Sequence, residues 1–158
     1  MTKFNNYFEE SASVISKLGA QISTIKEMAE EIYKLRKTNN KILIAGNGGS
    51  SADAEHFSGE LLCTFNDRER SGIAAISLSN NPSAITAWSN DFSFESYFTR
   101  QVESLGKKND VLFLITTGGG NKENGASMNL VHAAELGRSI GLKIFTIAGK
   151  GGGILKDF

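Results

Sequence analysis

The chain has 158 residues, a length that suits a single domain and allows a full hydrophobic core without disulfides. Its 17 basic and 17 acidic residues cancel, which argues against a generally basic nucleic-acid-binding protein. The only cysteine, Cys63, excludes a disulfide within the chain and favours a reducing compartment. No apolar run is long enough to cross a bilayer, and residues 1–13 are typical of neither a signal peptide nor a transit peptide.

Residues 2–38 are predicted to be helical, with a break or kink at Gly19. Both halves carry apolar residues at three- and four-residue steps, so each has a stripe that needs a partner. Two partners are equally consistent with the pattern, another subunit or the chain's own sheet. The stripe includes Phe4, Tyr7, Phe8, Val14, Ile15, Leu18, Ile22, Ile25, Met28, Ile32 and Leu35.

From residue 41 onward, short apolar segments alternate with segments of helical periodicity. Such an alternation is typical of a parallel sheet covered by helices on both faces. We therefore predict an α/β fold, a three-layer αβα sandwich with a central parallel sheet, in which N-terminal helices (1–38) precede one sheet domain (39–158). The expected strands are 41–45, 73–78, 110–115 and 142–148, and the expected helices are 50–65, 82–90, 94–105 and 125–140.

Three glycine-rich loops follow three of the predicted strands, at 46–51, 116–121 and 149–153. Open α/β sheets bind ligands at the carboxyl ends of their strands, where glycine lets the backbone approach and helix starts favour anions. Hydroxyls in the first two loops add donors, so a phosphate fits this edge, although ordinary tight turns would look similar. Neither a Walker loop nor a complete Gly-x-Gly-x-x-Gly fingerprint occurs, which favours a small phosphorylated substrate over a nucleotide.

His56 and Glu60 lie four residues apart and so share one face of the helix that follows the first glycine loop. The pair could act as a base and its partner, as two metal ligands, or as a solvated pair of a few tenths of a kcal/mol. Further along, Asp91 could orient a sugar hydroxyl or cap the helix that begins near Ser93.

Four motifs together closely resemble those of proteins with the sugar isomerase (SIS) fold. They are Gly46-Asn47-Gly48-Gly49-Ser50, His56 with Glu60, Asn90-Asp91-Phe92 and Thr116-Thr117-Gly118-Gly119. Within that fold the chain is similar to the phosphoheptose isomerases over nearly its whole length. The resemblance implies interconversion of sedoheptulose 7-phosphate and D-glycero-D-manno-heptose 7-phosphate. It also implies a cytoplasmic homotetramer, built partly by the N-terminal helices, that supplies heptose for lipopolysaccharide, capsule or S-layer sugars.

The resemblance assigns Glu60 as the catalytic base that moves a proton between two carbons through an enediol intermediate. It assigns His56 and Glu60 as two ligands of one zinc ion per subunit. Besides Glu60, it implies substrate binding by Asn47, Gly48, Gly49, Ser50, Asn90, Asp91, Thr116, Thr117, Gly118 and Ser127.

The chain departs from the family pattern in three places. Its phosphate loop has Gly118 in place of a hydroxyl residue and extra residues at about 120–126 before Ser127. A family arginine is Thr64 here, which makes Arg68 or Arg70 the candidate replacement. Family members also continue beyond the equivalent of Phe158, with a strand and a helix that carry a glutamine and a histidine of the site, so we expect a further C-terminal segment.

These departures keep other functions open. The main alternative is a non-catalytic SIS-fold module that binds a sugar phosphate or a protein partner, which the altered phosphate loop favours. The presence of Glu60 favours the enzyme. A SIS enzyme that acts on a six-carbon or N-acetylated sugar phosphate fits the motifs less well.

Overall fold

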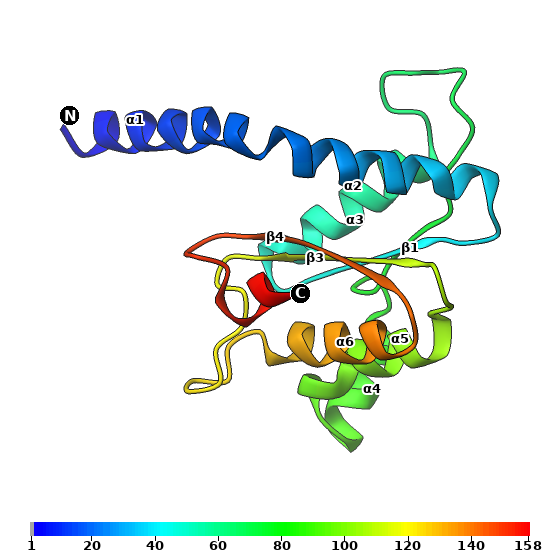
Figure 1. The fold of residues 1–158 in the computed structure, drawn as a ribbon. Coiled ribbons are helices and arrows are strands. Elements are labelled where there is room, and N and C mark those ends of the chain that lie inside the picture. The colour runs from blue at the N-terminus through cyan, green and yellow to red at the C-terminus, as the bar shows by residue number, and fades with distance from the viewer. Residues whose placement is uncertain (1) are drawn as a thin grey trace. The chain divides into compact units, whose positions relative to one another are not determined.

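The computed structural model describes residues 2–158, which form two compact units, one ending at Tyr33 and one comprising Lys34–Phe158 (Figure 1). The first unit holds α1 (Thr2–Lys17), a 3-10 turn (Leu18–Gln21) and most of α2 (Ile22–Lys34). The turn contains Gly19, so the predicted break is confirmed. In the described part of the chain, no helix combines the length and the apolar character that crossing a membrane requires.

The second unit is built on a parallel sheet with the strand order β2-β1-β3-β4. Its strands are β1 (Ile42–Gly46), β2 (Ala75–Ser77), β3 (Val111–Thr116) and β4 (Lys143–Ala148). All of β1 and nearly all of β3 is buried, as expected for central strands that are covered on both faces.

Helices cover the two faces of this sheet, with α3 (Gly49–Leu62) on one side and α5 (Tyr97–Leu105) with α6 (Met128–Ser139) on the other (Figure 1). The ring of Phe57 on α3 meets Phe113 of β3 edge to face, with ring centroids 5.1 Å apart. α4 (Pro82–Asp91) lies on the same side as α5. The predicted three-layer αβα sandwich is therefore confirmed.

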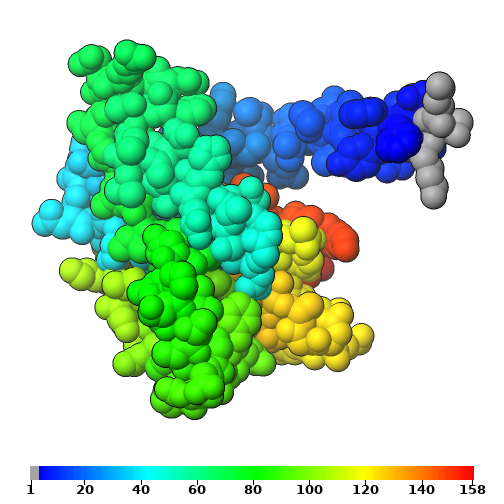
Figure 2. Space-filling view, turned by 180° about the vertical axis from the view of Figure 1, so that it is seen from behind, coloured from blue at the N-terminus to red at the C-terminus, as the bar shows by residue number. Residues whose placement is uncertain are grey.

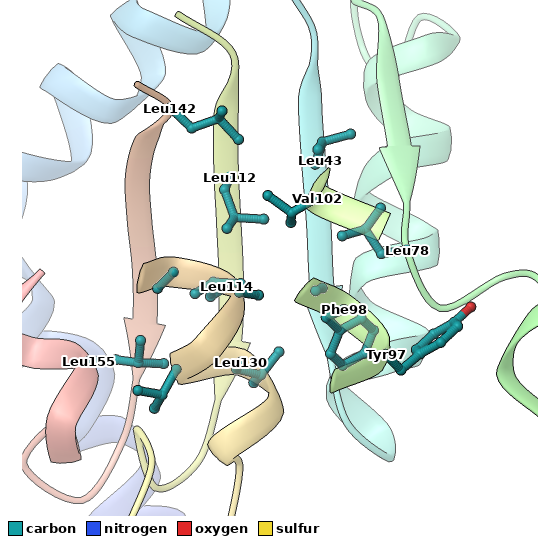
Figure 3. Packing of buried hydrophobic residues seen from close by; sticks show 14 of the residues in the cluster. Leu43, Leu78, Tyr97, Phe98, Val102, Leu112, Leu114, Leu130, Leu142 and Leu155 are labelled. Carbon is teal, nitrogen blue, oxygen red and sulfur yellow. The ribbon is translucent and has the colours of Figure 1, made fainter. Parts of the chain in front are cut away.

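The main core lies between the sheet and α5 with α6 (Figure 3). Leu112 and Leu114 of β3 face Phe98 of α5 and Leu130 of α6, and none of the four is more than 2% exposed. Burying one such side chain stabilises the fold by about 1.5–3 kcal/mol. The core thereby fixes α6 against β3, whose carboxyl end carries the second glycine loop.

Two predicted helices differ at their starts. The segment 94–105 begins as a 3-10 turn (Phe94–Ser96) that Ser93, and not Asp91, caps by accepting a hydrogen bond from the backbone N–H of Glu95. The segment 125–140 becomes helical only at Met128. Gly125 and Ser127 have φ angles of 72° and 56°, which a right-handed helix does not accommodate.

Candidate functional site

The carboxyl ends of β1 and β3 lie next to each other, because Gly46 pairs with Ile115 in the parallel ladder. The loops that follow these strands enclose a cavity of about 400 Å³, at the edge where a ligand site was expected. Figure 2 shows the start of α3 beside the segment that follows β3. The cavity is lined by Asn47, Gly49, Ser50, Asp53, Ile115, Thr116, Thr117 and Ser127.

Six of the predicted substrate-binding residues are thus brought together around one cavity, although they come from two loops far apart in the sequence. Gly48 and Gly118 belong to the same loops but are not among its lining residues. Asn90 and Asp91 also lie outside this lining, and both are exposed at the end of α4. The side-chain amide of Asn90 donates to Oδ1 of Asp91 over 2.7 Å.

The hydroxyl of Thr116 organises the second glycine loop. Its Oγ1 accepts hydrogen bonds from the backbone N–H groups of Gly118 at 3.4 Å and Gly119 at 3.2 Å, and it lies 3.5 Å from Oγ of Ser127. Both threonines line the cavity, but Thr116 is buried whereas Thr117 is exposed. The two threonines therefore have different tasks, and Thr117 with Ser127 offers hydroxyl groups to a ligand.

Asp53 and Asn129 were not predicted as site residues, and neither was Ile115, which also lines the larger cavity. Asp53, which the sequence suggests is only a favourable charge in the first turn of α3, lines the cavity. Asn129 is 4% exposed and pairs with Asn47 through two side-chain hydrogen bonds of 2.9 and 3.0 Å. A second cavity of about 230 Å³ adjoins this pair and is lined by Asn47, Phe94, Glu95, Gly125, Ser127, Met128 and Asn129.

His56 and Glu60 share a face of α3, as predicted, with Nε2 of His56 3.1 Å from Oε1 of Glu60. Both side chains reach solvent, with 78% of the His56 side chain and 37% of the Glu60 side chain exposed. Neither residue lines the two cavities. Within residues 2–158 no group of three or more His, Cys, Asp or Glu side chains could hold a metal, so the two residues fit a zinc ion only as part of its ligand set.

The third glycine loop packs against the second one. The backbone N–H of Leu155 donates to the carbonyl of Gly119 over 2.8 Å, and a Cβ added at Gly119 would overlap the carbonyl of Gly152. Gly119 also has a φ of 70°, which favours glycine. None of residues 149–153 is among the lining residues of the two cavities described above.

Arg70 is occupied by backbone contacts. Its guanidinium donates to the carbonyl oxygens of Glu60 and Cys63 at 2.7 and 2.8 Å and to those of Leu61 and Ser71, each at 3.0 Å. These contacts hold the loop after α3 against the last turn of that helix. Arg70 therefore acts as a cap, which speaks against it as a replacement for the family arginine.

The residues before Ser127 that were expected to be extra form a small closed loop. The backbone N–H of Asn121 donates to the carbonyl of Ala126 over 2.9 Å, and the side chains of Asn121 and Asn124 accept from the backbone N–H groups of Glu123 and Ala126. The two ends of this loop therefore lie close together, and Oγ of Ser127 remains 3.5 Å from Oγ1 of Thr116.

An α/β sandwich with a hydroxyl-lined cavity at the carboxyl ends of two parallel strands is the arrangement expected for a domain that binds a small ligand at this edge. The family model of the SIS domain matches residues 6–149, and the chain belongs to this family.

Relatives within the family include phosphoheptose isomerases. The enzyme of Helicobacter hepaticus is 40% identical over 154 residues, which cover 98% of this chain and 73% of that protein. The enzyme of Crocosphaera subtropica is 45% identical over 121 residues, 77% of this chain and 58% of the relative. The chain thus spans less than two thirds of the length of some of these curated relatives.

Solved structures agree with this assignment. A phosphoheptose isomerase from Francisella tularensis superposes with a TM-score of 0.84 at 31% identity, over 99% of this chain and 78% of that one. The predicted fold and the predicted family are therefore both confirmed.

Proposed function

We propose that this protein is an aldose–ketose isomerase that interconverts sedoheptulose 7-phosphate and D-glycero-D-manno-heptose 7-phosphate. The observation that carries the proposal is the cavity of about 400 Å³, which gathers the hydroxyl-bearing loops after β1 and β3. Glu60 lies on α3, whose first turns line that cavity. The identity to phosphoheptose isomerases supports the same reaction.

The phosphate group would bind at the side of the cavity formed by Thr117 and Ser127. Asp53 lines the cavity as well, and its carboxylate would repel a phosphate dianion. The opposite side is therefore better suited to sugar hydroxyl groups. Asp53 would accept hydrogen bonds from these hydroxyls, and Asn47 would both donate to them and accept from them. Neither cavity is lined by Lys or Arg, so hydroxyls and the start of α6 would replace a cationic clamp.

Glu60 would act as the base. Asp53, His56 and Glu60 are spaced by three and four residues, so one face of α3 leads from the cavity to this carboxylate. Glu60 removes a proton from the hydroxyl-bearing carbon next to the carbonyl, which yields an enediol. Returning the proton to the former carbonyl carbon, with a matching proton shift between the two oxygens, gives the aldose. The adjacent Nε2 of His56, 3.1 Å away, would orient the carboxylate.

The proposal is tested by incubating the purified protein with sedoheptulose 7-phosphate and following aldose formation by NMR. We expect turnover of sedoheptulose 7-phosphate and none of fructose 6-phosphate, the control substrate. Tight binding of sedoheptulose 7-phosphate without turnover would refute the enzyme and favour a binding module.

We also propose that His56 and Glu60 contribute two ligands to a zinc ion. Their spacing of 3.1 Å and their exposure make both side chains available to a metal. The remaining ligands would come from outside the residues that the structure describes. Zinc content of the purified protein, compared with that of His56→Ala, tests this, and equal metal content would refute it.

The N-terminal unit is proposed to build a homo-oligomer, expected to be a tetramer. Phe8, Val14 and Ile15 on α1 are 68%, 61% and 68% exposed, and apolar exposure of this extent marks interaction surfaces. The double variant Phe8→Glu/Ile15→Glu should have a lower molar mass than the wild type by light scattering, whereas Glu10→Gln should keep the wild-type mass. A wild-type monomer would refute the proposal.

A cytoplasmic location is proposed from the single free thiol, Cys63.

A further inference from the structure

The amide groups of Asn47 and Asn129 form a reciprocal pair. Nδ2 of Asn47 donates to Oδ1 of Asn129 over 2.9 Å, and Nδ2 of Asn129 donates to Oδ1 of Asn47 over 3.0 Å. The pair joins the loop after β1 to the first turn of α6. It therefore connects the two walls of the candidate site.

Asn129 is fixed more firmly than Asn47. It is 4% exposed, and its Oδ1 also accepts a hydrogen bond of 3.0 Å from the backbone N–H of Leu130. The backbone N–H of Leu130 is shared between this oxygen and the carbonyl of Ser127, and it favours the orientation of the Asn129 amide in which Nδ2 faces Asn47. This in turn fixes the amide orientation of Asn47.

Asn47 keeps hydrogen-bonding capacity for a ligand. The pair uses one of its two N–H groups and one of the two lone pairs of its oxygen. Asn47 lines both cavities, whereas Asn129 lines only the smaller one. Asn47 is thus the member of the pair that reaches the larger cavity.

We infer that Asn129 is a positioning residue that presents the amide of Asn47 to the substrate. The inference rests on the proposed function and adds a residue to its site. A preorganised amide costs less to order on binding than a free one. Removing Asn129 should therefore weaken catalysis and binding through Asn47, because it leaves Oδ1 of Asn47 without the donor that positions it.

A double-mutant cycle tests the inference. Asn129→Ala should lower kcat/KM for sedoheptulose 7-phosphate by about tenfold in the wild type but by less than about threefold in an Asn47→Ala background, because residues in direct contact are not additive. Asn66→Ala, an exposed asparagine outside the site, is the matched control and should change kcat/KM by less than about twofold. Equal losses in both backgrounds would overturn the inference.

Asn129→Asp supplies a second variant that conserves volume. Its carboxylate can still accept from Leu130 and from Nδ2 of Asn47 but cannot donate to Oδ1 of Asn47. We expect kcat/KM of this variant to fall by about tenfold, as for Asn129→Ala, while its unfolding transition stays cooperative. Wild-type kinetics for Asn129→Asp would overturn the inference.

The same cycle is measured on the affinity for sedoheptulose 7-phosphate by calorimetry. A wild-type protein that binds without turnover refutes the proposed reaction, while non-additive binding losses still support the role of Asn129. Additive binding losses overturn that role even in an active enzyme. A wild-type protein that neither binds nor reacts overturns both.

Discussion

The guanidinium of Arg70 donates a hydrogen bond of 2.7 Å to the backbone carbonyl of Glu60, the residue proposed as the base. The last carbonyls of a helix have no partner within it, and they attract cations because of the helix dipole. Arg70 donates to two of these groups in α3, those of Glu60 and Leu61, and to the carbonyl of Cys63, the residue after the helix. The position of the base is therefore coupled to a residue on the following loop.

Replacing Arg70 should loosen this helix end. We expect Arg70→Ala to lower the free energy of unfolding by about 2 kcal/mol, because it removes hydrogen bonds from a charged donor. It should also reduce kcat more than it raises KM, since Glu60 moves with the last turn. Arg70→Lys should restore only part of both losses, because an ammonium cannot span four carbonyls. Urea denaturation with steady-state kinetics measures the effects, and Glu69→Ala, at an exposed position on the same loop, is the control. Identical behaviour of the two alanine variants would contradict the prediction.

Glu60→Gln should remove the base without removing its volume. The neutral amide cannot take a proton, so we expect kcat to fall by roughly 10²–10⁴-fold while thermal unfolding stays the same. Glu55→Gln, at an exposed position on the same helix, should retain full activity. Turnover by Glu60→Gln within a factor of about three of the wild type would rule out the assigned role.

Gly119→Ala should disrupt the contact between the second and third glycine loops. The new methyl group would overlap the carbonyl of Gly152 at a φ of 70°, and we expect a loss of about 3 kcal/mol in the free energy of unfolding. Gly125→Ala is a matched control, since Gly125 has a φ of 72° but no atom within 4 Å of an added Cβ. It should cost only about 1 kcal/mol, from backbone strain alone. Equal losses, measured by denaturation, would show that the contact between the loops contributes nothing.

Asp110 predicts a pH dependence of stability. Burial by itself raises the pKa of this carboxyl, but hydrogen bonds from Lys41, Asn40 and Lys107 outweigh that effect and lower the pKa below its usual 3.8. Because the folded-state pKa lies below that of the unfolded chain, the stabilisation is complete above about pH 4 and is lost as the pH falls through the folded-state value. Asp110→Asn should therefore cost about 2 kcal/mol at pH 7, and the difference from the wild type should shrink in acid. A constant difference from pH 7 to pH 3 would contradict this.

The arrangement of the sheet follows from short-range patterns that the sequence carries directly. Apolar segments such as 110–115 can only be satisfied in a buried strand, and the helical segments between them leave a parallel sheet as the consistent solution. The carboxyl edge of that sheet could therefore be predicted, with the hydroxyls of Ser50, Thr116 and Thr117 in its loops. Asn47, Gly49 and Ser127 were assigned to the site only by the resemblance to the phosphoheptose isomerases.

The missed features depend on contacts between distant segments. Asn129 has the appearance of an ordinary polar residue in a first helical turn, and only its distance from Asn47 in space gives it a role. A glycine loop that receives a ligand and one that receives another backbone look the same in sequence, which is why the packing of Gly152 on Gly119 could not be foreseen. The sequence likewise suggested that the guanidinium of Arg70 could replace the family arginine, but it donates hydrogen bonds to four backbone carbonyls.

The closed insertion at 121–126 has a consequence for how this site can change. Its two ends are joined by the hydrogen bond from Asn121 to Ala126, while Gly119 on one side is held by Leu155 and Ser127 on the other begins α6. Length and composition can therefore vary between those anchors without displacing the hydroxyl groups at the cavity. We therefore expect changes within 121–126 to alter the rim of the proposed phosphate site while Thr117 and Ser127 keep their places at the cavity.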